Sequence, residues 1–138
     1  MKQEYRDLLK QDIQQQRYRD LLYKDLSGRL PYNVVINCTE DDDETVNFNC
    51  LLTPSLLDNI ISSAPMWIYK PYLRSMEDMT EEEDKEFALL QVQGGIDEDK
   101  YLYACDAANM INWLNKHHFD YRGLIDKGIV LRAPKGMY

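Results

Sequence analysis

The chain has 138 residues, of which 44% are hydrophobic and 29% charged, and its formal net charge is −8. This length and composition predict a single globular domain, residues 1–138, with one hydrophobic core. The acidic balance argues against direct binding to nucleic acid or to an anionic membrane, because both need clustered lysine and arginine side chains. With three cysteines, no CxxC pair and no long apolar run, we expect a cytoplasmic protein with reduced thiols.

The chain opens with a short duplication, in which YRDLLKQDI at 5–13 recurs as YRDLLYKDL at 18–26. Apolar residues at helical spacing in both copies predict an N-terminal helix, with 1–16 as a helical extension. The offset of 13 residues turns the apolar stripe by roughly 220°. Either the first copy projects and offers its stripe to another subunit, or a bend near 14–17 folds it back, or the duplication has no consequence. The first stripe consists of Tyr5, Leu8, Leu9 and Ile13.

Two apolar, β-branched runs at 32–38 and 45–52 predict a β-hairpin. The loop between them is acidic, and its carboxylates could bind a cation. However, it lacks the glycine and the distant glutamate of a calcium loop, so we expect a solvated turn. Pairing around this loop would place Cys38 near Val46 and Cys50 near Val34, with the two sulfurs far apart and no disulfide. The acidic residues of the loop are Asp41, Asp42, Asp43 and Glu44.

The middle of the chain carries a short helix and an aromatic segment. Thr53-Pro54 is typical of a helix start, and this helix should reach about Ser62. The aromatic run 66–73 could be an edge strand as far as Tyr69, because Pro71 is incompatible with a central strand.

A capping box, Thr80 with Glu83, predicts a helix that runs to about Gln91 and stops at Gly94-Gly95. Residues 100–104 favour a short strand, after which Asp106 would cap a helix through about His117. Together these elements predict an α+β fold, in which a small antiparallel sheet, the hairpin at about 32–52 plus short strands, is covered by helices.

One polar cluster could carry chemistry, namely His117-His118 with Asp120, Cys105 and Asp106 nearby. Imidazoles bind zinc or act as bases. Adjacent histidines at a helix end project in different directions, however, and the helix dipole already explains a histidine there. Cys105 as a nucleophile would lie about 18 Å along a helix from the histidines. We therefore expect capping and packing roles, with no catalytic residue, metal ligand or cofactor assigned.

Three blocks of the sequence carry a resemblance: LSGRLPYNVVIN at 26–37, YKPYLRSMEDMTEEE at 69–83, and WLNKHHFDYRGLIDKGIVLRAPKGMY at 113–138. They are similar to segments of small uncharacterised proteins of gut Bacteroidales and their phages and mobile elements. The resemblance implies a mobile-element origin, a cytoplasmic setting and no assigned activity.

The leading hypothesis is a non-enzymatic, acidic accessory protein of phage or mobile-element type that acts by protein–protein contacts. Its partner would be a host protein or a second copy of itself, including a host nucleic-acid-binding or defence protein that it inhibits or modulates. The first apolar stripe and the acidic loop would form the binding surfaces, and the stripe would drive homo-oligomer formation. The alternatives are a small metal-dependent enzyme or zinc protein centred on His117, His118 and Asp120, and a structural virion component.

Overall fold

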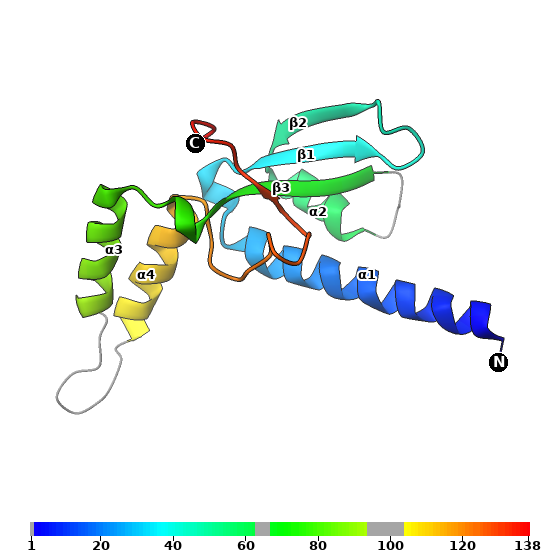
Figure 1. Cartoon of the computed structure of the whole chain (residues 1–138), viewed down its shortest axis with the longest axis horizontal. Coiled ribbons are helices and arrows are strands. Elements are labelled where there is room, and N and C mark those ends of the chain that lie inside the picture. Colours follow the sequence, from blue (N-terminus) through cyan, green and yellow to red (C-terminus); the bar gives the residue numbers. More distant parts are fainter. Residues whose placement is uncertain (1, 63–66, 94–103) are drawn as a thin grey trace. The chain divides into compact units, whose positions relative to one another are not determined.

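A computed structural model describes residues 2–62, 67–93 and 104–138 (Figure 1). Among these residues the structure contains four α-helices, two short 3₁₀ helices and a small mixed sheet of five strands, which confirms the predicted α+β class. The chain divides into two compact units, one ending at Pro71 and the other beginning at Tyr72. Strand β3 (Trp67–Ser75) belongs to both, because the division falls within it.

Helix α1 (Gln3–Ser27) of the first unit is continuous through residues 14–17, so the expected alternative of a bend there is wrong (Figure 1). It ends before Gly28, where the sequence predicted a stop. The 3₁₀ helix η1 (Leu30–Tyr32) follows and leads into the strands. Helix α2 (Pro54–Ile61) packs against α1 and begins as predicted, since the Thr53 hydroxyl accepts a hydrogen bond from the Leu56 amide at 3.1 Å.

The predicted hairpin is present, formed by the antiparallel strands β1 (Val35–Glu40) and β2 (Asn47–Leu51). Its register differs by two residues from the expected one: Cys38 lies opposite Phe48, and Cys50 opposite Ile36. The two sulfurs are therefore diagonal neighbours 3.2 Å apart, and the expectation that they are far apart is wrong. Both cysteines are free thiols.

Strand β3 continues through Pro71, which corrects the prediction that the strand ends near Tyr69. In the first unit it is the outer strand next to β1, paired from Glu40↔Trp67 to Ile36↔Pro71. After Pro71 it changes partners, because Tyr72 pairs in parallel with Leu131. Proline lacks an amide hydrogen, so it is tolerated at this change of partner, where one ladder ends and another begins.

A buried ion pair closes the end of α1. The Arg29 guanidinium donates to both carboxylate oxygens of Asp25, at 2.9 and 3.1 Å, and both side chains are fully buried. The core of this unit is built from apolar side chains of α1, α2 and the strands. The buried hydrophobic residues of this unit are Leu22, Leu26, Val34, Ile36, Cys38, Leu52, Leu57 and Ile60.

The second unit contains the 3₁₀ helix η2 (Met76–Asp78), the helices α3 (Glu81–Gln93) and α4 (Ala104–Lys116), and the short strands β4 (Phe119–Asp120) and β5 (Leu131–Arg132). Helices α3 and α4 pack against each other. Strands β4 and β5 pair with β3 in parallel, so the sheet is mixed and not purely antiparallel as predicted. Its buried apolar residues are Leu73, Leu114, Phe119, Leu124, Ile129, Val130 and Ala133.

The ends of α3 and α4 differ from the predicted ones. Helix α3 extends two residues beyond the expected end at Gln91. Helix α4 already begins at Ala104, so Asp106 lies inside its first turn and the prediction that it is the N-cap is wrong. The predicted stop at Gly94-Gly95 lies outside the described residues, as do residues 100–103 of the strand predicted at 100–104; its last residue, Ala104, belongs to α4.

Candidate functional site

The predicted apolar stripe of the first repeat lies on the surface of α1. The exposed fractions are 55% for Tyr5, 59% for Leu8, 39% for Leu9 and 55% for Ile13. The second repeat behaves differently: its residues Leu22 and Leu26, which correspond to Leu9 and Ile13, are buried in the core of the first unit. Two copies of one motif on one helix therefore have different surroundings, as the offset of 13 residues predicts.

The predicted acidic residues, Asp41, Asp42, Asp43 and Glu44, are all exposed between β1 and β2. The Asp43 carboxylate accepts hydrogen bonds from the amide and the hydroxyl of Thr45, at 3.0 and 2.6 Å. These bonds lower the pKa of Asp43. Asp41 lines the same cavity as Gln15 and Tyr18, so the start of the acidic loop lies beside the middle of α1.

This cavity of the first unit measures about 290 Å³ and was not predicted. Helix α1 contributes Arg19 to its wall, and β3 contributes Trp67 and Tyr69. The Nε atom of Arg19 is buried without a hydrogen-bond partner, although the side chain as a whole is only half-buried.

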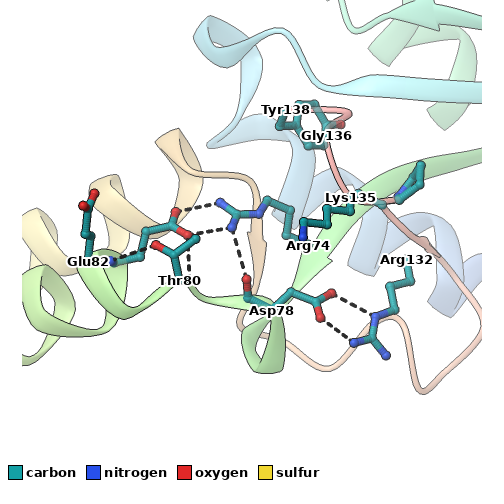
Figure 2. Close-up of a pocket in the computed structure, with 11 residues that line it drawn as sticks. Arg74, Asp78, Thr80, Glu82, Arg132, Lys135, Gly136 and Tyr138 are labelled. Carbon is teal, nitrogen blue, oxygen red and sulfur yellow. Dashed lines mark hydrogen bonds and ion pairs between the residues drawn. The ribbon is translucent and has the colours of Figure 1, made fainter.

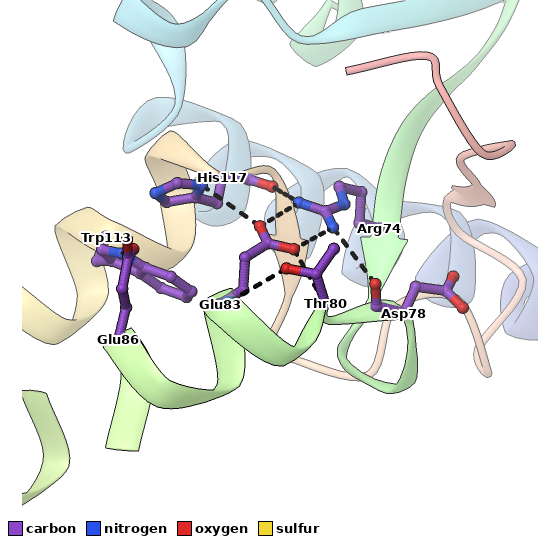
Figure 3. A network of polar contacts seen from close by, with 7 residues as sticks. All are labelled: Arg74, Asp78, Thr80, Glu83, Glu86, Trp113 and His117. Atoms are coloured by element: carbon purple, nitrogen blue, oxygen red, sulfur yellow. Dashed lines mark hydrogen bonds and ion pairs between the residues drawn. The ribbon is translucent and has the colours of Figure 1, made fainter. Parts of the chain in front are cut away.

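An ion-pair network in the second unit is centred on Arg74 of β3 (Figure 3). Its guanidinium donates to both carboxylate oxygens of Glu83, at 2.6 and 2.7 Å, and to the His117 carbonyl at 3.3 Å. The same guanidinium lies over the Phe119 ring, 4.2 Å from its centroid. Such bidentate, charge-assisted contacts fix the geometry of both partners.

Glu83 also completes the predicted capping box of α3. Its amide donates to the Thr80 hydroxyl at 3.1 Å, and its carboxylate accepts from the Thr80 amide at 3.1 Å (Figure 3). The Arg74 hydrogen bonds, aided by Thr80, lower the pKa of Glu83 to about 2. Glu83 is therefore a fixed anion near neutral pH, and it cannot donate a proton as a general acid.

The two histidines have separate partners. His117 lies 3.5 Å from the Glu83 carboxylate and packs on the Trp113 ring, 4.3 Å between centroids (Figure 3). His118 has a left-handed backbone with φ 64° and stacks on Tyr138 at 3.7 Å. The structure thus does not bring the two rings to one point.

Asp120, the third member of that predicted cluster, is buried and accepts hydrogen bonds from the amides of Leu124 and Ile125, at 3.0 and 2.9 Å. Both carboxylate oxygens are thereby used to shape the turn after β4. In the described part of the chain, no three histidine, cysteine or acidic side chains lie close enough together to share a metal ion.

A cavity of about 790 Å³ lies beside the Arg74 network (Figure 2). Arg132, on its wall, forms a second bidentate pair with Asp78, at 2.6 and 2.9 Å. Lys135 and Tyr138 of the C-terminal segment also line it. The volume is in the range of small-molecule sites, but a ligand anion would have to compete with Glu83 and Asp78 for the two arginines.

Sequence reasoning identified Thr80 and Glu83 only as a helix start and did not identify Arg74 or Arg132. The only sequence pattern that points to this pair is weak, namely an arginine inside a strand nine residues before the glutamate of a capping box. The pairing becomes visible only when β3 and α3 are placed side by side.

Comparison of the chain with protein families, with curated proteins and with solved structures found no match. No helix of the described residues combines the length and the apolarity that crossing a bilayer requires.

Proposed function

We propose that this chain is a non-catalytic, acidic accessory protein that acts through protein–protein contacts. The observation that carries the proposal is the exposed apolar stripe of the first repeat, Tyr5, Leu8, Leu9 and Ile13, on a helix that is continuous with the core. Exposed apolar groups at helical spacing are typical of helix-mediated association. The partner that binds to this stripe is a second copy of the same chain.

Charge supports self-association at this place. Residues 1–17 contain four basic and three acidic side chains, whereas the whole chain has 16 basic and 24 acidic ones. The first repeat is thus close to neutral within a strongly acidic protein. Two such helices can approach each other with less repulsion than the net charge of the whole chain would suggest.

The acidic loop is the second surface, and its occupant is a basic protein. The four consecutive acidic residues 41–44 are all exposed. The Asp43 carboxylate among them accepts a hydrogen bond from the Thr45 hydroxyl. Such a cluster can compete with phosphate groups for a basic groove. A nucleic-acid-binding or defence protein of a host is the class of target that this chemistry fits.

The mass of the full chain in solution over a range of concentrations, measured by light scattering, tests self-association. The full chain should form a dimer or a larger species. Leu8→Asp with Leu9→Asp should shift it to a monomer, because two charges would be buried in the interface at high cost.

The matched control is Gln3→Asp with Gln14→Asp, which adds the same charge to the opposite side of the same exposed helical segment. It should leave the assembly intact. A full chain that stays monomeric at every concentration, or two double variants that dissociate alike, would contradict the proposed interface.

A further inference from the structure

Cys38 and Cys50 lie on one face of the hairpin, on adjacent strands. Their Sγ atoms are 3.2 Å apart, and both thiols point toward the Ile36 carbonyl oxygen, at 3.9 and 3.8 Å. A disulfide has an S–S length near 2.05 Å, so the sulfurs need to approach by only ~1.2 Å. Side-chain rotation and a small movement of the strands can supply this.

We propose that Cys38 and Cys50 are a thiol modification site, at which an oxidant of the glutathione-disulfide class forms a reversible cross-strand disulfide. The proposal stands independently of the proposed function. The pair was not expected from the sequence, because the expected register placed the two sulfurs far apart.

The different burial of the two thiols sets the order of the steps. Cys38 is 2% exposed, whereas Cys50 is half-buried. Burial raises the pKa of Cys38 to about 12, and its contacts with Cys50 add to the shift. Because the thiolate is the attacking species and needs access to the oxidant, Cys50 reacts first.

The disulfide forms in two thiol–disulfide exchange steps. The Cys50 thiolate attacks one sulfur of glutathione disulfide and forms a mixed disulfide, and one glutathione thiolate leaves with the electron pair. Cys38, which loses its proton to that leaving thiolate or to water, then attacks the Cys50 sulfur and releases the second glutathione. Two protein thiols are oxidised, and one glutathione disulfide is reduced to two thiols.

The bond would close the base of the acidic loop. Cys38 lies in β1 and Cys50 in β2, and residues 41–44 lie between them. Oxidation therefore links the two strands that present the acidic surface. The loop would keep its charge but lose the freedom to open with its hairpin.

The test is the intact mass and the peptide map of the full chain after equilibration with glutathione disulfide and reduced glutathione, followed by alkylation. The expected intact mass is that of the chain plus one alkyl group, on Cys105, less about 2 Da for the two hydrogens lost from Cys38 and Cys50. The map should contain a linked pair of peptides with Cys38 and Cys50, and a dithiol reductant should reverse the link. The oxidised chain should melt on the order of 5 °C higher, because its unfolded state is constrained.

Variants separate the steps. Cys38→Ala should retain glutathione on Cys50, whereas Cys50→Ala should leave Cys38 as a free thiol because it is buried. Cys105→Ala is the control and should form the same cross-link. Glutathione that persists on Cys50 of the unaltered chain, three free thiols under oxidising conditions, or a link that includes Cys105 would overturn the proposal. The map of the unaltered chain decides the matter even if an alanine variant does not fold.

Discussion

Glu83 has two structural roles, since it caps α3 and accepts both guanidinium hydrogen bonds of Arg74. Its folded pKa of about 2 lies below its ordinary value of 4.5. A carboxylate with a lowered folded pKa stabilises the fold above its unfolded pKa, and this contribution is lost as the pH falls through the folded pKa. The contribution of Glu83 is therefore complete above about pH 4.5 and is lost between there and pH 2.

The change Glu83→Gln should lower the free energy of unfolding by about 1–2 kcal/mol at neutral pH, a figure that allows for solvent screening. The variant should also lose less stability than the parent chain between pH 4.5 and 2. Urea unfolding at a series of pH values measures both effects. Glu82→Gln is the control, because Glu82 lies in the same first turn but is exposed. Parallel pH profiles for Glu83→Gln and the parent would contradict this account.

At the scale of elements, the two repeats of α1 allow the same substitution to be compared at a buried and at an exposed position. Leu22→Ala removes a buried side chain and should cost about 2–4 kcal/mol of unfolding free energy, because it leaves a cavity in the core. Leu9→Ala is the same change one repeat earlier, at an exposed position, and should alter the unfolding free energy by less than about 0.5 kcal/mol. Urea unfolding at low protein concentration measures the two without a contribution from assembly. Equal losses of unfolding free energy in the two variants would mean that the first repeat is also packed in the core.

The elements themselves were largely predictable, because their signals are local. The Thr80–Glu83 capping box, the Thr53 cap and the hairpin all depend on residues within a few positions of each other. The hairpin register was not predictable, because the turn decides it. Asp43 binds Thr45, and the Glu40 amide donates to the Val46 carbonyl at 3.1 Å, so the loop spans 41–46 and lies two residues further along the chain than the expected 39–44. That difference brings the two cysteines together.

The candidate site of the second unit depends on contacts that no local pattern contains. Arg74 meets a glutamate nine residues away and the carbonyl of a residue 43 positions away. Arg132 pairs with Asp78 across 54 positions. Among so many arginines, aspartates and glutamates, composition cannot select the partners. Only the pairing of β3 with β4 and β5 brings these segments side by side.

At the scale of the whole molecule, the net charge of −8 makes copies of this chain repel each other. Salt screens that repulsion over a distance of about 10 Å at 0.1 M ionic strength. An interface of apolar side chains on a nearly neutral helix should therefore strengthen when salt is added. A complex between the acidic loop and a basic protein should instead weaken, because its attraction is screened.

The direction in which added salt changes the extent of association thus distinguishes the apolar stripe from the acidic loop as the interface. Sedimentation velocity of the full chain at low and at moderate salt should show a larger share of the associated species at moderate salt. Leu8→Asp with Leu9→Asp should sediment as a monomer in both conditions. An assembly that dissociates as the salt concentration rises would mean that charged groups hold it together. The interface would then have to be sought where opposite charges of two copies can meet, such as the acidic loop of one and the basic side chains Lys2, Arg6 and Lys10 of the other.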